Sequence, residues 1–234
     1  VKGPGHTAIG QQNQIYSIPA AEAEESQGSS SAIGNQNVVK GEQANAIGDG
    51  NDAYGHFTQS VGDDNKVYAD HSLGYGAHNK VGAQRAIGTP EKDVVVDKNT
   101  NKASVFGLNN EVVGKNVFVA GNDNKITDTS TSNATVIGFG ATASSANATA
   151  IGTAASALAN ETVAIGQAAK ASGQNSNAYG SQANASGTSS LAVGTGSVAS
   201  GDSAVAIGND STVTGGSAVA IGASATSTGK WSTA

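Results

Sequence analysis

Two short strings of acidic and amide residues are the first candidates for chemistry in this chain: Gly62-Asp63-Asp64-Asn65 and Gly121-Asn122-Asp123-Asn124. Clustered oxygen ligands of this kind suit calcium. A calcium-binding β-roll, however, is built on a nonapeptide Gly-Gly-x-Gly-x-Asp repeat, which the chain does not contain. We therefore interpret both strings as turns, and the sequence indicates neither a metal site nor a cofactor.

Four carboxylates come nearest to a catalytic cluster of the kind that polysaccharide hydrolysis requires: Asp49, Asp52, Asp63 and Asp64. Solvated turn acids explain them more simply, and no serine lies in the strand–turn–helix setting of a Gly-x-Ser-x-Gly nucleophile. The four histidines share no metal-like spacing: His6, His56, His71 and His78. We predict no catalytic residue. A carbohydrate-active or other β-solenoid enzyme and a phage-type fibre remain the alternatives.

The composition argues against several other classes. Charged residues make up 13% of the chain, and the formal net charge is -6. This balance favours neither a highly charged disordered tail nor a nucleic-acid partner. The chain has no cysteine, which removes disulfides and thiolate chemistry. With 32 Gly against 4 Phe, 5 Tyr and 1 Trp, the composition is not that of an ordinary globular domain.

A repeat sets the positions of all these residues. A small-apolar-Gly triplet recurs every 14 residues and ends at Gly152, Gly166, Gly180, Gly194, Gly208 and Gly222. We call this glycine the anchor, and earlier anchors are predicted at Gly10, Gly34, Gly48, Gly62, Gly74, Gly88, Gly107, Gly121 and Gly138. A second glycine often follows seven residues later, which leaves room for a short strand and a turn. So short a repeat cannot bury a face alone, so about 15 two-stranded coils are predicted to stack into an all-β parallel solenoid.

Alternation along each strand predicts which side chains share a face. The bulky residue before the anchor and the small residue before that one must point apart, yet both are apolar. One apolar face is buried in the solenoid's own core, so the other remains as an exposed apolar stripe, which predicts contact with a partner. We assign the repeat core to Ile137, Ile151, Ile165, Val193, Ile207 and Ile221. The second strand often starts with asparagine, and stacking predicts an amide ladder of Asn13, Asn37, Asn51, Asn65, Asn79, Asn110 and Asn124.

Two strings match a known motif, Asn-Ser-Val-Ala-Ile-Gly-x-x-Ser: Ser203-Ala204-Val205-Ala206-Ile207-Gly208-Asn209-Asp210-Ser211 and Ser217-Ala218-Val219-Ala220-Ile221-Gly222. Through them, and through their strict phase, residues 147–225 resemble the head of trimeric autotransporter adhesins, the YadA-like family of bacterial surface proteins. No repeat combines the leading Asn-Ser with the full motif.

The resemblance implies a left-handed parallel β-roll and a homotrimer exposed at the bacterial cell surface. It also implies that the outer membrane is reached only through a C-terminal anchor missing here. It further implies a non-enzymatic adhesin head that attaches to host extracellular matrix, cells or surfaces by multivalent binding. The partners would be a matrix protein such as collagen, a glycan or an abiotic surface, and not nucleic acid.

Insertions interrupt the repeat between Gly10 and Gly34 and between Gly88 and Gly107, where residues 94–102 are predicted to form a hairpin. We expect a divergent, loop-decorated part over residues 1–137, regular repeats over 138–229, and a further repeat or connector starting at 230–234. Both ends cut into the pattern, so we expect a piece of a longer protein. Loops on rigid scaffolds often carry binding groups, and a flat repeated face is the alternative. The candidate ligand-surface residues are Tyr16, Ile18, Glu22, Asp97, Lys98, Lys102, Lys66 and Lys125.

Overall fold

The computed structural model describes residues 5–16, 29–82 and 100–234. Short strands joined by tight turns form a parallel β-solenoid of about 13 turns with a repeat of about 14 residues. In these three ranges, no helix has the length and hydropathy needed to span a bilayer. The solenoid divides into two compact units, Val1–Asn122 and Asp123–Ala234. The predicted division at residues 137 and 229 stays a prediction.

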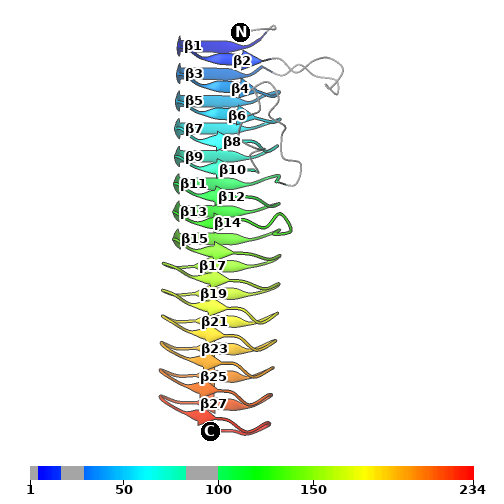
Figure 1. Cartoon of the computed structure of the whole chain (residues 1–234), viewed down its shortest axis with the longest axis vertical. Helices are drawn as coiled ribbons and strands as arrows, with labels where there is room; N and C mark the ends of the chain where they lie inside the picture. Colours follow the sequence, from blue (N-terminus) through cyan, green and yellow to red (C-terminus); the bar gives the residue numbers. More distant parts are fainter. Residues whose placement is uncertain (1–4, 17–28, 83–99) are drawn as a thin grey trace. The chain divides into compact units, whose positions relative to one another are not determined.

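In the first unit, each turn contributes one strand to each of two parallel sheets, which Figure 1 shows as two columns of arrows. The anchor sheet contains the anchor glycines, and its strands are β1 (Thr7–Gln11), β3 (Ser31–Asn35), β5 (Asn45–Asp49), β7 (Gln59–Asp63), β9 (Leu73–Ala77), β11 (Ser104–Leu108) and β13 (Phe118–Asn122). The second sheet consists of β2 (Gln14–Tyr16), β4 (Val38–Lys40), β6 (Asp52–Tyr54), β8 (Lys66–Val67), β10 (Lys80–Val81) and β12 (Glu111–Val112).

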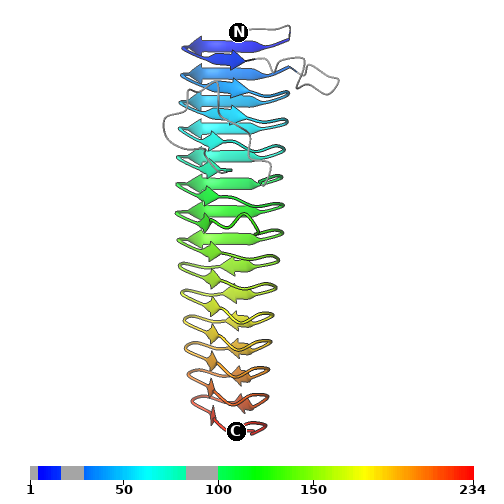
Figure 2. The same ribbon diagram turned by 45° about the vertical axis from the view of Figure 1, so that its right-hand side comes forward.

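The second unit repeats this arrangement with shorter strands, as the turned view in Figure 2 shows. Its anchor sheet consists of β15 (Thr135–Phe139), β17 (Thr149–Ile151), β19 (Val163–Ile165), β21 (Asn177–Tyr179), β23 (Leu191–Val193), β25 (Val205–Ile207) and β27 (Val219–Ile221). Its second sheet consists of β14 (Lys125–Ile126), β16 (Thr142–Ala143), β18 (Ser156–Ala157), β20 (Lys170–Ala171), β22 (Asn184–Ala185), β24 (Val198–Ala199), β26 (Thr212–Val213) and β28 (Thr226–Ser227).

The strand register corrects the predicted repeat between β9 and β11. Gly76, not Gly74, aligns with Gly62 on one side and with Gly107 on the other. Gly74 instead occupies the inward position that alanine holds in most turns, where an added Cβ would lie 2.9 Å from Cγ2 of Val67. Strand β9 pairs directly with β11, so no turn is anchored between them. The predicted anchor Gly88 lies outside the described residues, and the solenoid has fewer turns than the 15 predicted.

The predicted hairpin over residues 94–102 is corrected at its C-terminal end. Asn101 forms parallel bridges to Asp70 and to Lys115, so this residue already belongs to the stack. Residues 94–99 lie outside the described part of the chain. The insertion therefore ends before Asn101.

Small side chains fill the space between the two sheets. The residue two before the anchor points inward and is fully buried, as at Ala150 and Ala164, and the second residue of the second-sheet strand is buried as well, as at Ala157 in β18. The residues predicted as the repeat core occupy the opposite, outward face and are exposed or half-buried: Ile137, Ile151, Ile165, Val193, Ile207 and Ile221. Within one chain they are not the core, because alternation admits only one of two neighbouring residues and the smaller one fits between the sheets.

The asparagine ladder is confirmed in the first unit. Nδ2 of Asn51 donates to Oδ1 of Asn37 at 3.1 Å, and also to the carbonyl oxygens of Ile47 at 3.2 Å and Gly62 at 2.7 Å. Oδ1 of Asn51 accepts from Nδ2 of Asn65 in the next turn at 3.1 Å. These side chains are fully buried, so the ladder satisfies amides that would otherwise destabilise the core.

From the turn of Gly152 onward, the second unit closes the same turn through its own backbone. Here the position of the asparagine holds alanine or serine, and the backbone N–H of Ala155 donates to the carbonyl oxygen of its own anchor, Gly152, at 3.3 Å. Asn124 still holds this position in the first turn of the unit, where its Oδ1 accepts from the backbone N–H of Ala141 at 2.9 Å. In the first unit that N–H bonds to the preceding asparagine instead, as Asn51 N does to Asn37 Oδ1. The change coincides with the shortening of the anchor strands, which stop before the glycine from β17 onward.

The anchor glycines are predicted to be irreplaceable because consecutive turns approach each other there. A Cβ added to Gly48 would lie 1.9 Å from the carbonyl oxygen of Gly62, whereas one added to Gly50 would meet nothing closer than 3.7 Å. Both glycines have positive φ. We expect Gly48→Ala to lower the free energy of unfolding by about 3 kcal/mol or more, and Gly50→Ala by about 1 kcal/mol. Denaturant unfolding followed by circular dichroism measures both, and equal losses would contradict the role of close approach.

Candidate interaction surface

The outward side of the anchor sheet carries two columns of side chains, which we call together the outward stripe. The leading column lies three residues before each anchor and the trailing column lies one residue before it. None of these residues carries a charge. In the first unit the pairs are Thr7 and Ile9, Ser31 and Ile33, Asn45 and Ile47, Gln59 and Val61, Leu73 and Tyr75, Ser104 and Phe106, and Phe118 and Ala120. In the second unit they are Thr135 and Ile137, Thr149 and Ile151, Val163 and Ile165, Asn177 and Tyr179, Leu191 and Val193, Val205 and Ile207, and Val219 and Ile221.

Large apolar side chains of the stripe are open to solvent in the single chain. The exposed fraction is 36% for Ile33 and 63% for Ile221. Isolated apolar residues on a surface need no explanation, but a continuous apolar column marks a contact surface. The predicted uncovered stripe is therefore present on each unit, and its trailing column contains the residues that were assigned to the core.

Three aromatic rings form a strip within the first unit's part of the stripe. Tyr75 and Phe106 stack with ring centroids 5.5 Å apart, and Phe106 and Phe118 lie 5.9 Å apart at a tilt. The sequence interpretation did not single out these residues. The signal was available, because Tyr75 and Phe106 directly precede an anchor glycine and Phe118 stands three residues before one.

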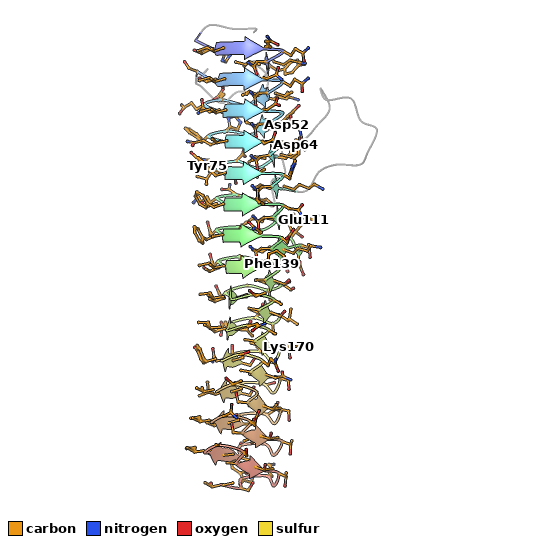
Figure 3. The ribbon with its side chains drawn as sticks, turned by 90° about the vertical axis from the view of Figure 1, so that its left-hand side faces the viewer. Asp52, Asp64, Tyr75, Glu111, Phe139 and Lys170 are labelled. Atoms are coloured by element: carbon orange, nitrogen blue, oxygen red, sulfur yellow. The ribbon has the colours of Figure 1, made fainter. Side chains whose placement is uncertain are left out.

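The opposite side of each turn is polar. Figure 3 shows Tyr75 on one side of the ribbon and Asp52, Asp64 and Glu111 on the other. Lys66 organises part of this face, since its Nζ lies 3.1 Å from Oδ1 of Asp64 and 3.4 Å from Oδ2 of Asp52. Nζ also donates to the carbonyl oxygen of Gly50 at 2.9 Å, and the Tyr68 hydroxyl donates to Oδ2 of Asp52 at 2.6 Å.

This network shifts the ionisation of its members. Burial acts to raise the pKa of Asp64, but hydrogen bonds and charges from Lys66 and His78 outweigh burial and hold that pKa below its ordinary value. Burial acts to lower the pKa of Lys66, and the charge of Asp52 together with Asp64 more than offsets it. Burial, followed by the charge of Asp52, raises the pKa of the Tyr68 hydroxyl. The Asp64 carboxylate is thus stabilised in its charged form by Lys66 and His78.

The predicted ligand-surface residues are scattered over separate turns. Tyr16 is exposed in β2 and donates its hydroxyl to Oε1 of Gln14. Lys102 is exposed in a turn and Lys125 is exposed in β14, whereas Lys66 is half-buried in the network just described. The structure does not gather these four into one site. The other four candidates lie outside the described residues: Ile18, Glu22, Asp97 and Lys98.

The residues considered for chemistry are also separate. His6 accepts from the backbone N–H of Ser30, His56 lies 3.7 Å from Glu42, His71 stacks on Phe57, and His78 lies 3.4 Å from Asp64. Asp49 and Asp63 occupy equivalent positions in adjacent turns, while Asp52 and Asp64 are bridged by Lys66. In the described ranges, no group of three or more His, Asp or Glu side chains is placed to hold a metal ion.

A parallel β-solenoid with a repeated uncharged face defines a solenoid repeat protein. Residues 132–155, 157–183 and 185–211 match the model of the YadA head domain repeat. No curated protein matches the chain significantly. Over these residues the chain carries YadA head domain repeats, the repeats of trimeric autotransporter adhesin heads. The match confirms the predicted resemblance for residues 132–211. The YadA head family consists of non-enzymatic adhesin domains.

The Lys66 network predicts a pH-dependent contribution to stability. We expect Lys66→Ala to lower the free energy of unfolding at neutral pH by about 1 kcal/mol more than Lys80→Ala. Lys80 is the matched control because it occupies the same position in the next turn and is exposed. The Asp64 pKa is lower in the folded chain, so its stabilisation is present above the ordinary value of 3.8 and is lost as pH falls below it. The Lys66 pKa is raised, so its stabilisation is present below 10.5 and is lost as pH rises through the folded-state pKa. A difference between the two variants that does not change with pH would contradict this account.

Proposed function

We propose that the chain forms part of the head of a homotrimeric surface adhesin, in which three copies pack through the outward stripe. The observation that carries this proposal is the stripe itself, a face without charge on each unit whose trailing column is aliphatic or aromatic in every turn. The second-sheet strands of the first unit, by contrast, carry charged residues such as Lys66 and Glu111, and Figure 3 shows Glu111 on the side opposite Tyr75. Depletion of charge on one apolar face is typical of the core of a permanent interface.

A cyclic trimer fits this stripe because the stripe runs in the direction in which turns stack. Three chains arranged around an axis in that direction bring every turn of the stripe toward the axis. The second sheet and the turns then face outward. We propose a left-handed roll for each chain, in line with the family to which the repeats belong.

The proposed mechanism of attachment is multivalent. Three chains on one head present each binding group three times, and many heads on one cell convert weak contacts into strong avidity. We propose that the ligand is a host matrix protein such as collagen, a glycan, a cell or an abiotic surface, and that binding involves no catalytic turnover. The two insertions remain candidate ligand surfaces, with the flat second sheet as the alternative. Lys66 is the weakest of the candidates because its charge is already neutralised by Asp52 and Asp64.

Trimer formation is tested by sedimentation. We expect a mass near three times 22.8 kDa. Ile165→Asp places an unpaired carboxylate in the interface, which costs about 3 kcal/mol or more per chain, so it should shift the protein to monomer or prevent folding. Lys170→Asp is the control, since Lys170 is exposed on the second sheet of the same repeat, and it should remain trimeric. A β-rich monomer at micromolar concentration would overturn the proposal.

Ligand binding is tested by deleting the insertions. Removing residues 83–99 restores the 14-residue spacing between Gly76 and Gly107, and removing residues 18–27 restores it between Gly10 and Gly34. Each deleted protein is compared with the parent on an array of matrix proteins and glycans. If the insertions bind, adhesion falls by at least about tenfold while the trimer persists, because avidity multiplies each lost contact. Full adhesion by folded trimers would assign binding to the flat second sheet.

A further inference from the structure

The side chains of the outward stripe change size in a particular order in two adjacent turns. In β11 the leading residue is small and the trailing residue is large, Ser104 and Phe106. In β13 the order is reversed, with Phe118 leading and Ala120 trailing. The adjacent strand β9 is large in both columns, with Leu73 and Tyr75. Turns nearer the N-terminus also lack the alternation: Ser31 and Ile33 in β3 are followed by Asn45 and Ile47 in β5.

The packing of a cyclic trimer makes this order meaningful; the argument from here rests on the proposed trimer. Contacts around a threefold axis are heterologous, so one edge of each chain's stripe meets the other edge of its neighbour's stripe. The leading column of one chain therefore faces the trailing column of the next. Without a shift along the axis, residues of the same turn meet. Ser104 then faces Phe106 of the neighbour, and Phe118 faces the neighbour's Ala120, so that each contact joins a large side chain to a small one.

A slip of one chain by one turn destroys this match. Shifts between neighbours around a closed ring sum to zero, so the slipped chain has one contact shifted in each direction. At one of them Phe118 faces Phe106 of the neighbour and overfills the contact, and at the other Ser104 faces Ala120 and leaves a void. At β3 and β5 the same shift only changes whether Ser31 or Asn45 of one chain faces an isoleucine of its neighbour, so it changes the packing energy little. Nearly identical turns leave the alignment of chains weakly specified, as they do for strands of uniform pattern.

We propose that Ser104, Phe106, Phe118 and Ala120 fix the axial register in which three copies of this chain assemble. The rings already pack on one another in the single chain, since the ring centroid of Phe106 lies 5.5 Å from that of Tyr75 and 5.9 Å from that of Phe118. The exposed fractions of Phe106 and Phe118 are 38% and 40%, so both rings have surface left for a neighbouring chain. The set determines which alignment forms, and the rest of the stripe supplies most of the apolar contact.

Disulfide trapping reads out the register directly. The chain has no cysteine, so every cross-link comes from introduced pairs. Asn45→Cys with Ile47→Cys places both thiols in one turn, Asn45→Cys with Val61→Cys reports a shift of one turn, and Asn45→Cys with Ile33→Cys reports the opposite shift. In the otherwise unchanged chain, we expect the same-turn pair to cross-link at least about tenfold more than either offset pair.

Two sets of substitutions, each introduced together with these pairs, separate register from assembly. Ser104→Thr, Phe106→Ile, Phe118→Thr and Ala120→Ile together make both turns resemble the β15 turn, and offset cross-links should rise to match the same-turn product. The control exchanges the order, with Ser104→Phe, Phe106→Ala, Phe118→Ser and Ala120→Phe, and should keep the same-turn product dominant because large still meets small.

The outcomes distinguish the register proposal from the proposed trimer. If the variant with Ser104→Thr, Phe106→Ile, Phe118→Thr and Ala120→Ile still forms only same-turn cross-links, the register proposal is overturned and the proposed trimer is not affected. A trimer by sedimentation that forms no same-turn cross-link in the unchanged chain overturns the pairing of columns, and the register proposal with it. A monomer in every case overturns the proposed trimer itself.

Discussion

The close approach of one turn's anchor glycine to the carbonyl of the next turn is the constraint on which the rest of the structure depends. A Cβ at Gly34, Gly48 or Gly62 would lie 1.9–2.1 Å from the carbonyl oxygen of the following anchor. Because only glycine permits this contact, it must recur at one place in every turn. Each turn then lies directly over the last, and residues of equivalent position form columns. The buried alanines, the asparagine ladder and the outward stripe are all such columns.

Whatever is periodic in this chain could be predicted from its sequence. The two strands per turn and the asparagine ladder follow from spacing alone. Gly74 shows where that reasoning fails, because a glycine can mark an anchor or serve as the smallest inward residue, and only packing against Val67 decides between them. The isoleucines before the anchors show a second limit. Alternation separates them from the alanines but does not say which set lies inside, and the distance between the sheets decides that.

Contacts that occur at only a few turns were harder to predict from the sequence than those that repeat in every turn. Lys66 bridges Asp52 and Asp64 across adjacent turns, and Tyr75, Phe106 and Phe118 join through ring contacts. Such contacts depend on the register of side chains separated by 14 residues or by a whole insertion. They are visible in a sequence only after the correct anchors are known. With Gly76 as the anchor, Lys80 falls in the same column as Lys66.

The two ways of closing the turn after the anchor give the two units different freedom to vary in length. In the second unit, Ala155 and its equivalents bond within their own turn, and the inward column is nearly uniform alanine. One turn could be duplicated or removed there and its neighbours would meet the same surface as before, so the solenoid is adjustable in steps of 14 residues. In the first unit, a ladder asparagine such as Asn51 bonds to groups of the turns on both sides, and a Cβ at Gly74 would be too close to Val67. Each of those turns makes contacts that depend on its position in the stack. Recombination that exchanges or deletes a turn of the first unit would therefore break contacts, whereas recombination among the later turns would preserve them.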